Sequence, residues 1–208
     1  MPNPLIGFRR LLRSHSKRAA TLVSMLGREV ITPDEFRERI YQLLWEGHTE
    51  ARWLGRIRAG DDSTDKPDEQ DRYLAAIWMQ NENEFLDRLT ARIKAGDFKL
   101  GNKGFKFDQL LVRVQAYMKI YRASASDAFV DASDRDETFT WTLGRAERHC
   151  KDCPRMARNS PYTIYTLPYL PGQCRTECLY NCYCHIVRDS DRLIAFKYYK
   201  MPKIKIVA

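Results

Sequence analysis

The chain has 208 residues, of which 35 are lysine or arginine and 27 are aspartate or glutamate, so its formal net charge is +8. This length allows one domain or two small ones and can bury a core without a metal. The hydrophobic content of 44% excludes an intrinsically disordered chain. No stretch approaches the roughly 20 apolar residues that span a bilayer, so we expect no membrane contact. The positive charge favours polyanions but indicates no reaction.

Residues 1–31 are predicted to form a basic N-terminal helix or arm. Basic and apolar side chains are interleaved there, and no apolar run ends in small residues, which argues against a secretory signal. A solvated helix face or a disordered arm explains the basic residues as well as phosphate contact does. The candidates for contact with nucleic-acid phosphates are Arg9, Arg10, Arg13, Lys17 and Arg18.

Residues 32–137 are predicted to form an antiparallel helical bundle. Thr32, Pro33 and Glu35 have the pattern of a capping box with proline in the first turn. A polar loop follows at residues 60–70, then a helix over residues 71–95 that ends at Gly96, and a third helix over residues 107–132. The expected core positions are Phe36, Ile40, Leu43, Leu44, Ala51, Leu54 and Ile57; Leu74, Ile77, Trp78, Phe85, Leu89 and Ile93; and Leu110, Val114, Met118, Tyr121, Ala125 and Phe129.

Residues 138–208 are predicted to form a cysteine-rich module, because all six cysteines lie between positions 150 and 184. Zinc takes four ligands in a tetrahedron, and cysteine pairs separated by two to four residues are its usual donors. Such a closed Zn²⁺ site would be structural, because no position remains for a substrate. The preferred ligands are Cys150, Cys153, Cys178 and Cys182, with Cys184 as a substitute and Cys174 as a spare.

The spacing leaves two other states open for the cysteines. Six thiols can pair as disulfides, or they can stay free and buried. The proline-rich segment between the cysteine pairs predicts an extended loop with a turn at Pro171 and Gly172, which would bring the pairs together. Beyond residue 185 the pattern predicts one or two short strands that include Tyr198, Tyr199 and residues 204–207, which either pair with a neighbouring subunit or complete the module's own sheet.

The residues around the cysteines resemble a segment of the head morphogenesis family, the minor head proteins of tailed bacteriophages. In that family a tryptophan leads into Glu-x-His-Cys-x2-Cys, followed by Leu-Pro-x-x-Pro-Gly and by Cys-x3-Cys-x-Cys with an apolar residue. The matching positions are Trp141, Glu147, His149, Cys150 and Cys153; Leu167, Pro168, Pro171 and Gly172; and Cys178, Cys182, Cys184 and Ile186. The resemblance covers residues 139–187, and Cys174 and Tyr183 depart from the pattern.

The resemblance implies a structural virion protein that is made in the host cytoplasm and acts near the portal during head assembly. Its partners would be other capsid, portal or neck subunits, in several copies, and packaged DNA without sequence preference. The alternative is a zinc-stapled nucleic-acid-binding or regulatory protein. An enzyme is not expected, because a site closed by four thiolates has no position for a substrate. Glu147 and His149 are the only candidate bases, and we expect both to pack or hydrogen-bond around the cysteine pair. In all, the sequence predicts a mainly α chain: an antiparallel helical bundle followed by a small zinc-stapled α+β module.

Overall fold

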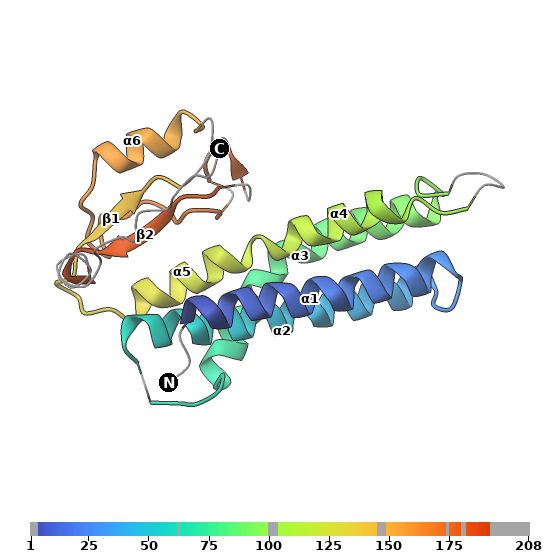
Figure 1. Cartoon of the computed structure of the whole chain (residues 1–208), viewed down its shortest axis with the longest axis horizontal. Helices are drawn as coiled ribbons and strands as arrows, with labels where there is room; N and C mark the ends of the chain where they lie inside the picture. The colour runs from blue at the N-terminus through green and yellow to red at the C-terminus, as the bar shows by residue number, and fades with distance from the viewer. Residues whose placement is uncertain are drawn as a thin grey trace, which may run out of the picture.

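A computed structural model describes residues 4–61, 63–99, 104–144, 149–173, 175–179 and 182–191. Its first five helices run back and forth along one axis as an antiparallel bundle, and the remaining elements form a small module beside the end of α5 (Figure 1). This confirms the predicted fold class. The elements are α1 (Pro4–Gly27), α2 (Pro33–Ala59), α3 (Glu69–Lys94), α4 (Phe107–Met118), α5 (Tyr121–Asp131), β1 (Phe139–Thr142), α6 (Asp152–Arg158) and β2 (His185–Arg188).

Helix α2 is the centre of the bundle and packs against α1, α3 and α5. It begins as predicted, because the Thr32 hydroxyl accepts a hydrogen bond from the Glu35 N–H at 3.2 Å, and the Glu35 carboxylate accepts one from the Thr32 N–H at 2.7 Å. All seven residues expected in its core are buried. The helix ends at Gly60, whose φ of 99° is in the left-handed region that suits glycine.

Helix α1 is amphipathic, as predicted for residues 1–31. It buries Leu11, Ala19 and Val23 against the bundle, while Arg9 and Arg13 are exposed. Within the described ranges, no helix carries an apolar stretch of the length that a bilayer requires.

Helix α3 starts two residues earlier than predicted, at Glu69. Asp68 and Asp71 form a capping box, each side chain accepting a hydrogen bond from the other's backbone N–H. The Arg56 guanidinium of α2 lies 2.6 Å from the Asp68 carboxylate and 2.7 Å from that of Asp71. This shared arginine fixes the start of α3 on the end of α2. The helix ends at Gly96 (φ 85°), as predicted.

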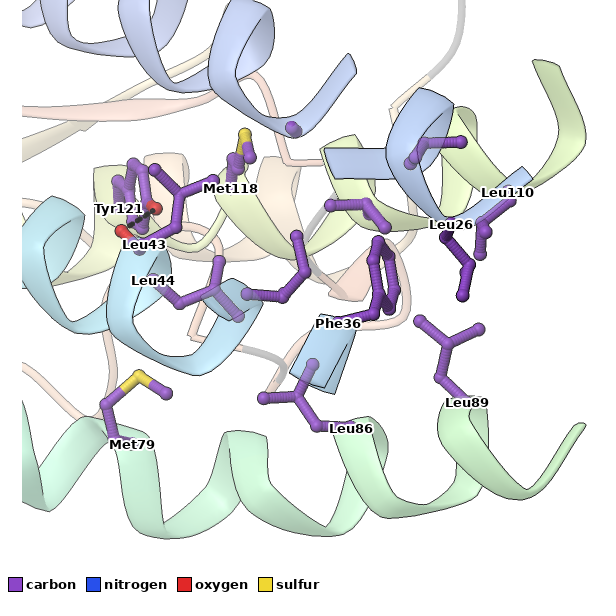
Figure 2. Packing of buried hydrophobic residues seen from close by; sticks show 14 of the residues in the cluster. Leu26, Phe36, Leu43, Leu44, Met79, Leu86, Leu89, Leu110, Met118 and Tyr121 are labelled. Carbon is purple, nitrogen blue, oxygen red and sulfur yellow. Dashed lines mark hydrogen bonds between the residues drawn. The ribbon is translucent and has the colours of Figure 1, made fainter. Parts of the chain in front are cut away.

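The core face of α3 differs from the predicted one. Ile77 and Phe85, which were expected in the core, are 43% and 42% exposed. Figure 2 shows Met79, Leu86 and Leu89 directed toward α2 instead. The prediction selected the largest apolar residues, whereas the face that meets α2 includes small and polar ones. The buried residues of α3 are Asp71, Ala75, Met79, Glu82, Leu86, Leu89, Thr90 and Ile93.

The predicted third helix is two helices, α4 and α5, although the core positions expected for it are correct except that Ala125 is only partly buried. The break comes where the N–H groups of Lys119 and Ile120 bond to carbonyls three residues back instead of four. The next residue, Tyr121, is fully buried, and its hydroxyl donates to the Leu43 carbonyl at 3.2 Å (Figure 2). Its ring lies over Gly47, where a Cβ atom would come within 2.0 Å of the ring. No glycine or proline marks this break, so the sequence pattern did not reveal it.

The C-terminal module contains an antiparallel sheet of two four-residue strands, in which Trp141 of β1 pairs with Ile186 of β2. Neither β1 nor the short helix α6 was predicted, and β2 begins at the position beyond which strands were predicted. The predicted turn is present: Gln173 N–H bonds to the Leu170 carbonyl at 3.1 Å, and Gly172 has a φ of 81°. The residues named for the strands predicted beyond residue 185, Tyr198, Tyr199 and residues 204–207, lie outside the described residues.

Two arginines hold the module on the bundle. Arg58 of α2 donates to the Ile186 carbonyl at 2.6 Å, and Arg188 of β2 donates to the Ala59 carbonyl at 2.9 Å. Both guanidinium groups lie over the ring of Phe129 on α5, at 4.0 and 5.7 Å from its centroid. These crossed contacts fix the orientation of β2 relative to the bundle.

The buried carboxyl of Glu82 allows the bundle core to be tested through the pH dependence of its stability. The residue is 2% exposed and its Oε2 has no hydrogen-bond partner among the described residues, and burial raises its pKa to about 7. Because the pKa of Glu82 in the folded state exceeds that in the unfolded chain, the stability that its protonated form contributes is fully present below pH 4.5 and is lost as the pH rises through 7. We expect Glu82→Gln to raise the free energy of unfolding at pH 8 by up to about 3 kcal/mol, with the gain vanishing near pH 4.5.

Urea unfolding across this pH range measures the effect. The control is Glu84→Gln, because the Glu84 side chain on the same helix is 82% exposed. A gain for Glu82→Gln that does not vary with pH would contradict the assignment of a buried, titrating carboxyl.

Candidate metal centre

The first cysteine pair lies at the start of α6. Cys153 is in the first turn of this helix, and Cys150 lies two residues before its first residue, Asp152. The resulting turn places the two Sγ atoms 3.4 Å apart. The sulfur atoms of this Cys-x2-Cys pair therefore lie close together, as predicted, and the first turn of α6 brings them together.

The second group of cysteines lies before β2. Cys178 follows Thr176, whose hydroxyl lies 3.2 Å from the Cys178 Sγ. Cys182 and Cys184 lead directly into the strand, and both are buried. The chain at Tyr183 passes so close to Gly144 that a Cβ atom there would come within 2.0 Å of the Tyr183 carbonyl oxygen. Glycine is therefore needed where the end of β1 meets this segment.

Two carboxylates join the cysteine segments to each other. The Asp152 carboxylate accepts a hydrogen bond from the Glu177 N–H at 2.9 Å, and the Glu177 carboxylate accepts one from the Lys151 N–H at 3.0 Å. The sequence analysis did not find this reciprocal pair. The available signal was an acidic residue directly beside a cysteine in each segment, at Asp152 and Glu177.

The sulfur atoms have separations that suit a metal ion. The Sγ atom of Cys153 lies 3.4 Å from that of Cys150, 3.7 Å from that of Cys178 and 3.6 Å from that of Cys182. The edge of a zinc–thiolate tetrahedron with Zn–S bonds near 2.3 Å is about 3.8 Å. A disulfide requires about 2.05 Å, and all five described cysteines are free thiols. The donor set fits zinc, which prefers thiolates among its ligands.

The cysteines form two groups of three, each with its sulfur atoms within 4.8 Å of one another. One group is Cys150, Cys153 and Cys178, and the other is Cys153, Cys182 and Cys184. The preferred ligand set is thus divided, because its first three members form one group and Cys182 belongs to the other. Cys184, predicted as a substitute, is a full member of the second group. Cys174 lies outside the described residues, so its predicted role as a spare is not addressed.

The thiols of this sulfur cluster (Cys150, Cys153, Cys178, Cys182 and Cys184) differ in acidity. Hydrogen bonding from the Cys182 side chain lowers the pKa of Cys184 to about 5. The same contact, together with burial, raises the pKa of Cys182, and burial raises that of Cys153. Hydrogen bonds with Cys153 lower the pKa of Cys150 although burial opposes them. Neighbouring thiols therefore share protons, and a cation that displaces those protons would stabilise all of them as thiolates.

The sulfur cluster is also the core of the module. Trp141, Met156 and Tyr162 are buried against its cysteines, and the Trp141 ring meets that of Tyr169 edge to face at 6.1 Å. The elements of the module are short, two four-residue strands and a seven-residue helix, and its other buried hydrophobic residues, Phe139, Leu170 and Ile186, cluster with Phe129 and Val130 of α5. Such short elements are marginal alone, so the sulfur cluster occupies the position of a small hydrophobic core.

The predicted phosphate contacts on α1 separate into different environments. Arg9, Arg13 and Lys17 line a shallow groove between α1 and α4, together with Gln115. Arg18 instead points toward α2 and forms an ion pair of 2.7 Å with Glu46. Arg10 is exposed and is not among the residues that line this groove. The candidate base Glu147 lies outside the described residues, and His149 is partly buried beside Cys150.

In comparisons with known proteins, no family model, curated protein or solved structure matches this chain.

Metal removal generates a test of the centre. A chelator should open the module, because folding energy supplied by bound zinc is lost with the ion. The five-helix bundle has a separate core and should remain helical. We expect the fluorescence of Trp141, which is 1% exposed, to shift to longer wavelength while the far-ultraviolet circular dichroism changes little.

Comparison with Trp141→Phe isolates that signal from the other tryptophans. Cys153→Ser should reproduce the effect without chelator. An unchanged Trp141 emission at full chelation would show that the module does not need a metal.

Proposed function

We propose that this chain is a structural protein of a tailed-bacteriophage particle, a minor head protein near the portal that acts in head assembly through protein–protein contacts. The observation that carries the proposal is the resemblance of residues 139–187 to the head morphogenesis family. The structure supports it in one respect. The motif positions that it describes, including Trp141, Cys150, Cys153 and Ile186, gather in one module, as expected for a motif that builds a fold rather than a reaction centre.

Structural zinc is the second part of the proposal. Thiolates from both cysteine segments would hold Zn²⁺, and the ion would keep the loop between them folded on the end of the bundle. Arg58 and Arg188 would transmit this rigidity to the bundle, because they join β2 to the end of α2. The proposal assigns the ion no catalytic step.

Contact surfaces for neighbouring subunits are available on the bundle. Tyr73, Ile77 and Phe85 are exposed along α3, and Val112 is 65% exposed on α4. The proposal assigns these side chains to contacts with neighbouring subunits, because such contacts would bury apolar surface that is exposed in the single chain. They support capsid, portal or neck subunits as partners.

The proposal is tested by whether the protein is found in purified phage particles. Mass spectrometry of gradient-purified particles from the producing host should detect this chain with the other structural proteins, in fewer copies than the major capsid protein. Recovery only from the particle-free lysate would overturn it. The reading frames beside the gene supply a second test, since portal and large terminase genes are expected there. A gene with no such neighbours would favour the alternative, a zinc-stapled nucleic-acid-binding or regulatory protein.

Packaged DNA is a proposed partner of the α1 groove. Arg9, Arg13 and Lys17 follow one another at four-residue steps, about 6 Å apart along the helix axis, and no ion pair is recorded for them within the described residues. Phosphate contact by such residues releases counterions. A plot of the logarithm of the binding constant against the logarithm of the salt concentration therefore has a slope of about −0.9 for each phosphate contact.

Filter binding of duplex DNA across salt concentrations measures this contribution. Arg13→Ala should reduce the slope by about 0.9. Arg18→Ala is the matched control, because Glu46 already neutralises Arg18, and it should leave the slope nearly unchanged. Equal effects of the two substitutions, or a flat salt response of the wild type, would exclude the groove as a DNA contact.

A further inference from the structure

The sulfur cluster has more donors than one zinc ion can use. Tetrahedral zinc binds four ligands, and the cluster contains five described thiols. In a site for one ion, the four liganding sulfur atoms would surround a common centre and the fifth would lie apart. The five sulfur atoms instead form two groups of three, and Cys153 is the member that they share.

Cys153 lies between the two groups. Its sulfur atom is within 3.7 Å of those of Cys150 and Cys178 on one side, and 3.6 Å from that of Cys182 on the other. These three distances from Cys153 are close to the edge of a zinc–thiolate tetrahedron, about 3.8 Å, and the remaining pairs within each group lie within 4.8 Å. Cys182, by contrast, is not part of the group that contains Cys150 and Cys178.

From this arrangement we propose that the module binds two zinc ions that share the Cys153 thiolate. Cys150, Cys153 and Cys178 hold one ion, and Cys153, Cys182 and Cys184 hold the other. A thiolate has enough lone pairs to bind two cations at once. Three protein thiolates leave one position on each ion, which a further side chain or water fills. The inference rests on the zinc site of the proposed function and deepens it.

Charge supports two ions over one. One Zn²⁺ with four thiolates has a net charge of −2, and the fifth thiol must then stay protonated. Two Zn²⁺ ions with five thiolates have a net charge of −1. Cys153, Cys182 and Cys184 are buried, and buried net charge is costly unless it is compensated. The second ion reduces the net negative charge, and it makes each of the five described cysteines a ligand.

Native mass spectrometry of the full chain purified with zinc tests the stoichiometry. The mass difference between native and denatured protein should equal two zinc ions. A difference of one ion would overturn this inference and leave the structural zinc of the proposed function intact. A difference of zero would overturn both.

Serine variants test the bridge. Cys150→Ser and Cys184→Ser each remove a ligand from one group only, so each should reduce the bound zinc from two ions to one. Cys153→Ser removes the shared ligand and should lose both ions. Loss of only one ion from Cys153→Ser, or of both from Cys184→Ser, would contradict the assignment of Cys153 as the bridge.

Cadmium replacement provides a measurement that does not depend on whether the variants fold. The wild-type chain loaded with ¹¹³Cd should give two metal resonances that split each other, because the two nuclei are coupled through the Cys153 sulfur. A single resonance, or two resonances without mutual splitting, would exclude the bridge.

Discussion

The convergence of two chain segments on the Cys153 sulfur is the contact on which the C-terminal module depends. Strands of four residues and a helix of seven have little apolar surface to bury against one another. Three cysteine sulfurs within 3.7 Å of Cys153 take the place of a core. The hydrogen bonds between the Asp152 and Glu177 segments bring the same two segments together from outside. The free energy of unfolding of the module therefore depends strongly on the interactions that hold these sulfur atoms together.

The bundle and the module differ in how far each depends on the other for its fold. The bundle has its own core around Phe36 and Tyr121, so we expect it to fold without a metal. The module needs the bundle as a support, because Arg58 and Arg188 reach across the junction to carbonyl groups on opposite sides of it. In the proposed phage particle, this arrangement would present the loop surface of the module at one end of a long helical body. Neighbouring subunits could then contact the helices and the module independently.

Local signals predicted much of this fold. The capping box at Thr32 and the glycine at Gly96 gave the helix ends, because they act through adjacent backbone groups. Features that depend on distant contacts were missed. The break before Tyr121 arises where its side chain enters the core beside Leu43, and the core face of α3 follows from its contact with α2. Likewise, cysteine spacing predicted the candidate ligands as a set, but their division around Cys153 depends on where α6 and β2 place them.

The central claim is that cysteine thiolates bind zinc and thereby fold the module. X-ray absorption at the zinc edge of the purified full chain tests it most directly. We expect stoichiometric or higher zinc with a first shell dominated by sulfur at about 2.3 Å. Zinc absent from the purified protein, or zinc surrounded mainly by oxygen and nitrogen at about 2.0–2.1 Å, would contradict the account.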